Sequence, residues 1–226
     1  AILPSQGRIG ATRKFIDSYL MKDGSRFTDK PGYESMPYAQ QFENRDPRLA
    51  ASIVTNGSTW NGRVIDQSAG GSDDMARTNA SRTGYYLKKF LTDGLNLTQG
   101  QTAQHNWVAY RWAEVLLNYA EAMNEAFGPD AVPSGYAMSA RQALQQVRDR
   151  ASVNLPAVTA ADKDSFREAV KHERRIELAF EDHRYWDLLR WKDAMEVLNR
   201  PVLGVKIARN GEEWSYEVTE VATRTF

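Results

Sequence analysis

The sequence contains no cysteine, and this absence excludes several functional classes at once. Disulfide-stabilised scaffolds, zinc sites built on thiolates, thiol nucleophiles and lipids attached to a thiol all require that residue. With only 3 His in the chain, a histidine-rich metal site is not expected either. We therefore expect no metal site and no cofactor.

An excess of positive charge is missing too. The 29 Lys and Arg residues are balanced by 29 Asp and Glu residues, so the chain lacks the basic surplus that drives binding to nucleic-acid phosphates. No stretch approaches the roughly 18–20 apolar residues of a membrane-spanning helix. Residues 1–6 lack the charged and apolar parts of an export signal. Residues 217–226 end without a turn-forming or helix-capping residue. We expect a fragment at both ends.

The residues that are present describe a globular chain rich in aromatic side chains. The 226 residues, 42% of them hydrophobic, correspond to one large or two small domains. There are 6 Trp, 10 Tyr and 8 Phe, which hints at a stacking surface, although most aromatic residues belong to cores.

Residues 1–105 are expected to be a loop-rich region. Turn-forming pairs recur along it, because Gly, Asn and Asp tolerate a positive φ; they are Asp23-Gly24, Pro31-Gly32, Asn56-Gly57, Asn61-Gly62, Gly70-Gly71 and Asp93-Gly94. Between them the pattern predicts short strands near Leu49–Thr55 and Tyr85–Leu91, and short helices near Arg13–Tyr19 and Tyr38–Glu43. Loops of this length in a compact domain are usually either functional or held unusually firmly by the rest of the fold.

Residues 106–200 are expected to be helical, because apolar side chains recur there at the spacing of one helix face. The pattern predicts four helices, over residues 112–127, over residues 140–151, from Ser165 through Phe180, and over residues 183–199. Their large rings at helical spacing are expected in the core, namely Trp112, Tyr119, Trp186 and Trp191, whereas Trp107 is expected to start the first helix. Residues 201–226 are predicted to be a truncated loop and strand segment, with one strand at Trp214–Val218.

The first two helices also fit part of the tetratricopeptide spacing. Trp112, Val115-Leu116 and Tyr119 keep the spacing of the first helix, Ala143 and Val147 keep that of the second, and Pro156 follows. Leu116 replaces the usual glycine, and the loop between the helices is longer than in a standard repeat. Amphipathic helices produce such a match by chance, so this feature alone leaves the question open.

Several segments together resemble the C-terminal half of the SusD/RagB family of surface glycan-binding lipoproteins. The matching segments occur in the right order over nearly the whole chain; they are Asn44–Leu49, Thr83–Phe90, Tyr110–Ala122, Ala143–Ala151 and His172–Trp191. The resemblance implies a mainly α fold, in which tetratricopeptide-like helix pairs support a long loop-rich ligand face with a few short strands. The lipidated N-terminus and several scaffold helices of the family are not in this chain.

Three acids on the third predicted helix allow two interpretations. Glu173, Glu177 and Glu181 are four residues apart and are interleaved with arginines. Two of them could form a carboxylate pair for acid–base catalysis, or all three could form an ion-pair network that locks helices together. We favour the network, and we expect no catalytic residues. Ser72-Asp73-Asp74 is likewise interpreted as an exposed turn rather than a cation site.

Candidate ligand residues are sought among aromatic residues in predicted loops, since sugar faces stack on rings and sugar hydroxyls pair with amides and Arg. Trp60 stands between turns, with Asn56, Asn61 and Arg63 beside it, which predicts an exposed stacking platform. The rings of Tyr33 and Tyr38 are further candidates.

The resemblance implies a non-enzymatic nutrient-binding subunit of a polysaccharide-utilisation system. Such a protein captures oligosaccharide on the cell outer membrane and passes it to a SusC-type TonB-dependent transporter. It meets the membrane only through an N-terminal lipid anchor, which this chain lacks. Two other classes stay open: a helical glycoside hydrolase, and a scaffold that binds protein alone.

Overall fold

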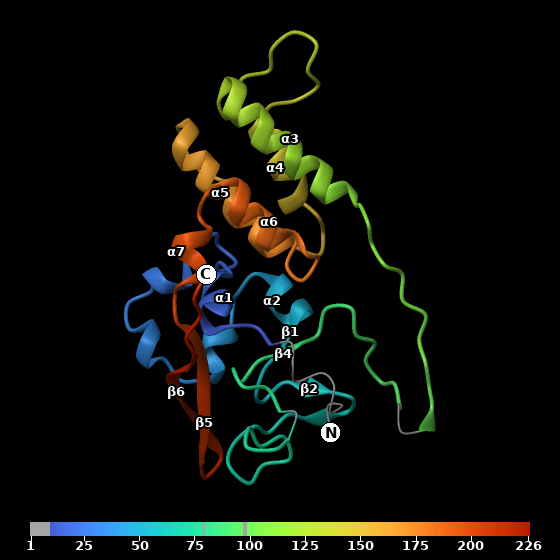
Figure 1. Cartoon of the computed structure of the whole chain (residues 1–226), viewed down its shortest axis with the longest axis vertical. Coiled ribbons are helices and arrows are strands. Elements are labelled where there is room, and N and C mark those ends of the chain that lie inside the picture. Colours follow the sequence, from blue (N-terminus) through green and yellow to red (C-terminus); the bar gives the residue numbers. More distant parts are fainter. Residues whose placement is uncertain (1–9, 79, 97–98) are drawn as a thin grey trace.

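The computed structural model describes residues 10–78, 80–96 and 99–226. Figure 1 shows α3, α4 and α5 at one end of the molecule, and the loops and a long β-hairpin at the other. Residues 1–9, in which no leader was found, and residues 79, 97 and 98 of the expected loop-rich region lie outside the described residues.

The first hundred residues form short elements joined by turns. In chain order these are α1 (Arg13–Ser18), η1 (Phe27–Asp29), η2 (Tyr33–Ser35), η3 (Ala39–Phe42), α2 (Pro47–Ser52), β1 (Ile53–Val54), β2 (Thr59–Trp60), β3 (Arg63–Val64) and β4 (Tyr86–Leu87). The expected helices near residues 13–19 and 38–43 are present, the second as a 3₁₀ turn. The strand predicted from Leu49 is wrong over its first part, because the Asp46 carboxylate caps a helix there and Pro47 takes its first position.

Two small antiparallel pairs hold this region together. β1 pairs with β4, so that Val54 lies opposite Tyr86. β2 pairs with β3 in a tight hairpin, closed by Asn61 and Gly62, both with positive φ, as the two-residue turns of hairpins require.

The helical region contains α3 (Trp112–Phe127), α4 (Ala140–Arg148), α5 (Lys163–Glu177), α6 (His183–Arg190) and α7 (Ala194–Leu198). Its core is a single apolar cluster that includes Leu116, Leu117, Ala120, Met123, Ala143, Leu144, Val147, Phe166 and Val170. The mainly α fold with few short strands is confirmed.

Several helix boundaries differ from the prediction: α4 ends at Arg148 rather than at Ala151, and α5 ends at Glu177 rather than at Phe180. α5 begins at Lys163, since Asp162 caps it and pairs reciprocally with Ser165; Ser165 was expected as the start. The fourth predicted helix is two helices, because Lys192 adopts φ 63° and breaks the hydrogen-bond ladder between α6 and α7.

Two rings expected in the core are on the surface. Trp112 and Trp186 are each 65% exposed, while Tyr119 and Trp191 are half-buried. The helix spacing was correct, but α3 has a second apolar stripe, and Leu116 and Ala120 rather than Trp112 face the core. Trp107, expected at the helix start, lies before α3 and is exposed.

The C-terminal segment forms the largest sheet among the described residues, where one strand was predicted. β5 (Val202–Asn210) and β6 (Glu213–Ala222) form a long antiparallel hairpin. Val205 and Ile207 of β5 pack with Ile16 and Tyr19 in a second core. None of the helices in the described part of the chain is long and apolar enough to cross a membrane.

Candidate functional site

Trp60, predicted to be an exposed stacking ring, is only 4% exposed. Its side chain packs in a small cluster with Val54, Ile65 and Tyr86, and Leu91 covers one side. The prediction of exposure is wrong because the pairing of β1 with β4 places apolar side chains against the hairpin. Trp60 is therefore a core residue that stabilises the surrounding loops.

The polar residues beside Trp60 are engaged within the protein. Asn56 is buried and accepts a hydrogen bond from the backbone N–H of Gln67 at 2.8 Å. Asn61 is exposed, but its Oδ1 accepts from Gly94 N at 2.8 Å, and its own N–H donates to the Asp93 carboxylate at 2.7 Å. These bonds clamp the hairpin tip to the 93–94 turn.

Arg63 makes a bidentate pair with Asp73, with both bonds at 2.5 Å. Asp73 also accepts from Ser72 and from the backbone N–H of Asp66, and Asp74 accepts backbone N–H groups within the same turn. The turn interpretation of Ser72-Asp73-Asp74 is supported, since protein donors occupy both carboxylates. The expected exposure is wrong for Asp73, however, which is buried beneath its pair with Arg63. Within the described ranges, no group of three or more His, Asp or Glu side chains could hold a metal ion.

The two tyrosines differ in accessibility. Tyr38 is buried, with its ring edge-on to Phe42 and Tyr216, and burial raises the pKa of its hydroxyl well above the ordinary value. Tyr33 is half-buried, its ring 5.5 Å from that of Phe27. Of the six predicted residues, only Tyr33, Asn61 and Arg63 reach solvent.

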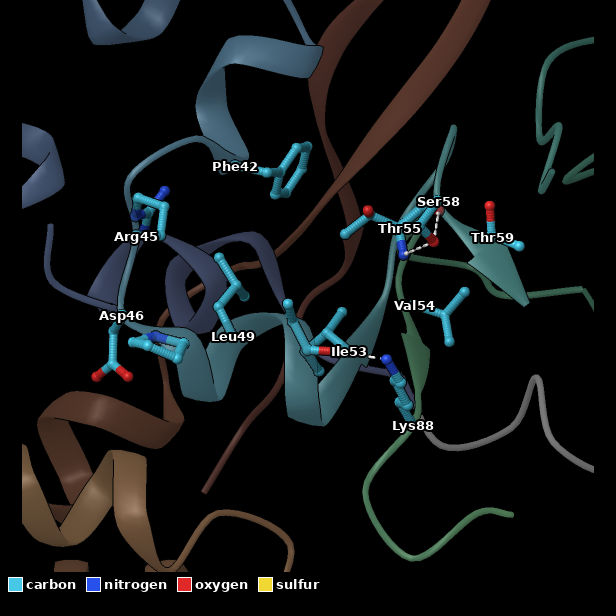
Figure 2. A pocket seen from close by; sticks show the side chains of 12 residues that line it. Phe42, Arg45, Asp46, Leu49, Ile53, Val54, Thr55, Ser58, Thr59 and Lys88 are labelled. Atoms are coloured by element: carbon cyan, nitrogen blue, oxygen red, sulfur yellow. Dashed lines mark hydrogen bonds between the residues drawn. The ribbon is translucent and has the colours of Figure 1, made fainter. Parts of the chain in front are cut away.

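A cavity of about 150 Å³ lies beside the hairpin, between α2 and β1 (Figure 2). Its walls are mainly apolar, with Leu49, Ile53 and Val54 among them. The polar groups at its edge are used internally: Ser58 Oγ donates to the Thr55 carbonyl at 2.7 Å, and Lys88 Nζ donates to the Ala50 carbonyl at 2.9 Å. The cavity is smaller than the roughly 300–1,000 Å³ of typical small-molecule sites.

The three acids of the His172–Trp191 segment form an ion-pair network, as favoured from the sequence. Glu173 pairs with Arg48 and Arg148, and Glu177 pairs with Arg48, Arg111 and Arg150. The partners are not the neighbouring arginines, and Glu181 is not on the helix, since α5 ends at Glu177. The network joins α5 to two other helices, to α2 through Arg48 and to α4 through Arg148, and α2 belongs to the loop-rich region.

The network keeps its carboxylates ionised. Burial raises the pKa of Glu177, but hydrogen bonds from Arg111 and the charges of Arg48, Arg111 and Arg150 outweigh this effect and lower the pKa to about 2. The pKa values of Glu173 and Glu181 are lowered in the same way, against burial, by their own cationic partners. A general acid needs a raised pKa, so these three residues do not suit acid–base chemistry.

A cleft of about 280 Å³ opens beside this network. Its lining comes from five separate segments and comprises Arg48, Ala51, Ser52, Lys89, Phe90, Val108, Arg111, Arg150, Ile176, Glu177 and Glu181. Phe90 is the aromatic ring of this lining and is 38% exposed. Sequence reasoning missed the cleft because its walls meet only in the fold. The one available signal was Phe90 itself, which ends the Thr83–Phe90 segment.

A wider hollow of about 700 Å³ lies over residues 21–30. Most of its lining residues are polar or charged; they are Met21, Lys22, Asp23, Ser25, Arg26, Asp29, Lys30 and Asn44. It contains no aromatic ring. The 280 Å³ cleft therefore matches the requirements of sugar binding better, since it combines a ring with polar groups.

Comparisons with known proteins agree on one family. A family model described as "SusD family" matches residues 5–225. The chain is 29% identical over 169 residues to SusD-like protein P2 of Formosa agariphila, covering 72% of this chain and 32% of the relative. It is 30% identical to SusD-like protein P25 of the same organism, covering 66% of this chain and 30% of the relative. The chain thus spans about a third of the length of these relatives.

Two solved structures share the fold. A SusD-like protein from Bacteroides fragilis matches with a TM-score of 0.78 and 29% identity, over 96% of this chain and 42% of that one. A SusD-like carbohydrate-binding protein from the same species matches with a TM-score of 0.70 and 35% identity, over 85% of this chain and 37% of that one.

Proposed function

This chain belongs to the SusD family, and from that premise we propose that it is a glycan-binding protein that captures oligosaccharides without cleaving them. The observation that carries the proposal is the likeness to the solved SusD-like carbohydrate-binding protein, at 35% identity and a TM-score of 0.70. The state of the three acids supports the absence of cleavage, because their arginine partners hold them ionised.

The wider role follows from the family alone. We propose that the complete protein serves a polysaccharide-utilisation system as a nutrient-binding subunit on the outer membrane. It would be held there by a lipid at its N-terminus and would deliver oligosaccharide to a SusC-type TonB-dependent transporter. Trp60, Tyr38 and Asn56 would support the ligand face from beneath, while Tyr33, Asn61 and Arg63 are the predicted residues that reach its surface.

One incubation separates this proposal from its alternatives. The protein is mixed with fluorescently labelled polysaccharides, and the mixture is passed over a size-exclusion column. Co-elution of labelled, full-length polysaccharide with the protein is the expected result. Shortened polysaccharide would indicate a glycoside hydrolase, and labelled material that elutes free and intact in every case would favour a scaffold that binds protein alone.

A further inference from the structure

We propose that Phe90 is the stacking platform of an oligosaccharide site in the 280 Å³ cleft between α2 and α5, an assignment that rests on the proposed glycan-binding function. The cleft lies where the loop-rich region meets the helical region: Ala51 and Lys89 of the first and Arg111, Arg150 and Glu177 of the second line it. Its volume is just below the range of small-molecule sites, so it would hold only a short stretch of a sugar chain.

The backbone of Phe90 marks the position as unusual. Its φ is 70°, in the left-handed region that bulky residues avoid and glycine adopts easily. A large ring at such a position is strained, and strain of this kind is found at ligand clamps, where the surrounding structure enforces it. A purely structural turn would be served better by glycine.

The segment before Phe90 is fixed to both walls of the cleft. The backbone N–H groups of Lys88 and Lys89 donate to the Ser52 carbonyl at 2.8 and 3.1 Å. The Lys89 ammonium donates to the carbonyls of Glu177 and Ala179 at 3.2 and 3.0 Å. These bonds tie the residue preceding Phe90 to the end of α2 and to the end of α5.

The segment after Phe90 is fixed to the hairpin. Leu91 packs on the Trp60 cluster, and the Asn61 tip holds Asp93 and Gly94 through two hydrogen bonds. The residues first expected to touch sugar thus position the segment that carries Phe90. With both flanks anchored, the strained conformation is over-determined and the ring is held in place.

The ring itself is available. It is 38% exposed, with His105 edge-on at 5.5 Å and the Lys89 ammonium 5.5 Å from its centre. A sugar face could therefore stack on the part of the ring that is open to solvent. Arg150 supplies the polar partner: its side chain is 40% exposed, its Nε and Nη2 are engaged with Val147 and Glu177, and its Nη1 has no partner among the described residues. That nitrogen could donate to a sugar oxygen.

The test replaces Phe90 with a residue that tolerates its backbone conformation, so that an effect on glycan binding can be separated from an effect on folding. Phe90→Gly removes the ring and relieves the backbone, so the thermal midpoint should stay within about 3 °C of the wild type. Lys192→Gly is the matched control, because Lys192 has φ 63° and an exposed side chain away from the cleft lining. The wild type is first screened on an array of malto-, cello-, xylo-, manno- and uronate-containing hexasaccharides. The tightest binder is then titrated calorimetrically into each variant.

Affinity for that hexasaccharide should fall at least about tenfold in Phe90→Gly and stay unchanged in Lys192→Gly. If the wild type binds and Phe90→Gly binds equally well, the site is wrong while the proposed function stands. If the wild type binds nothing on the array, the proposed function fails with it. Should Phe90→Gly fold poorly, Phe90→Asn, which also tolerates positive φ, provides the same comparison; unchanged affinity in that variant would overturn the proposal.

Discussion

Arg48 and Glu177 are 129 positions apart in the sequence, yet Arg48 Nη1 donates a hydrogen bond of 2.9 Å to Glu177 Oε2. The same guanidinium also pairs with Asp46 and Glu173, so one buried cation serves three buried carboxylates. The contact fixes α2 against α5 and thereby sets the width of the cleft that Phe90 lines.

Replacing Arg48 with Met should destabilise the protein by about 3–5 kcal/mol, because the change leaves buried carboxylates without their cation. The free energy of unfolding in urea measures this loss. Arg167→Met is the control: its partners Glu125 and Asp164 are exposed, and exposed pairs contribute about 1 kcal/mol or less. Equal stabilities of the two variants would contradict the importance given to the network.

The network should also make the protein sensitive to acid. The pKa of Glu177 in the folded state is about 2, below its ordinary value, so its contribution is complete above about pH 4.5 and is lost as the pH falls toward 2. A shift of this size corresponds to about 3 kcal/mol. Glu177→Gln should be less stable at pH 7 and should show a shallower loss of stability between pH 4.5 and 2.

Chemical denaturation of wild type and variant at several pH values in that window measures the difference. Glu168→Gln is the control, since the Glu168 side chain is largely exposed and its removal should leave the pH dependence unchanged. A Glu177→Gln variant that follows the wild-type curve would contradict the assignment.

Trp60→Ala should lower the free energy of unfolding by about 3–5 kcal/mol, because it leaves a cavity among Val54, Ile65 and Tyr86. The thermal midpoint reports the change. Val64→Ala, on the neighbouring strand and exposed, should have little effect. If Trp60→Ala keeps the wild-type midpoint, the ring is on the surface after all.

Trp112→Ala should cost little stability, about 1 kcal/mol or less, because the ring is mostly in solvent. Leu117→Ala, on the same helix and fully buried, should cost about 2–5 kcal/mol. Urea unfolding of the two variants gives the comparison. A larger loss for Trp112 than for Leu117 would reverse the assignment of the faces of α3.

Trp60 and Trp112 show what the sequence could and could not predict. The helical spacing located α3, and the Asn61-Gly62 pair located a turn, but the hairpin that this turn closes was not predicted. Which way a ring faces is not local information, however: α3 carries two apolar stripes, and Trp60 is buried only because residues 53–54 pair with residues 86–87. The ion-pair network was predicted from its acids, but its cationic partners come from segments up to 129 positions away.

Local sequence patterns could not predict the candidate cleft for the same reason. Its walls join α2, the segment around Phe90 and the end of α5, and no spacing rule connects residues so far apart. The positive φ of Phe90 could not be predicted from the sequence either, because phenylalanine does not indicate a left-handed backbone conformation.

Affinity gel electrophoresis tests most directly whether the protein binds glycan without cleaving it. The chain is run through native gels that contain soluble polysaccharides of different backbone types, and each polysaccharide is recovered and sized afterwards. The account predicts retarded migration in at least one gel, with that polysaccharide recovered at its original length. Unretarded migration in every gel, or a retarding polysaccharide recovered in shortened form, would contradict it.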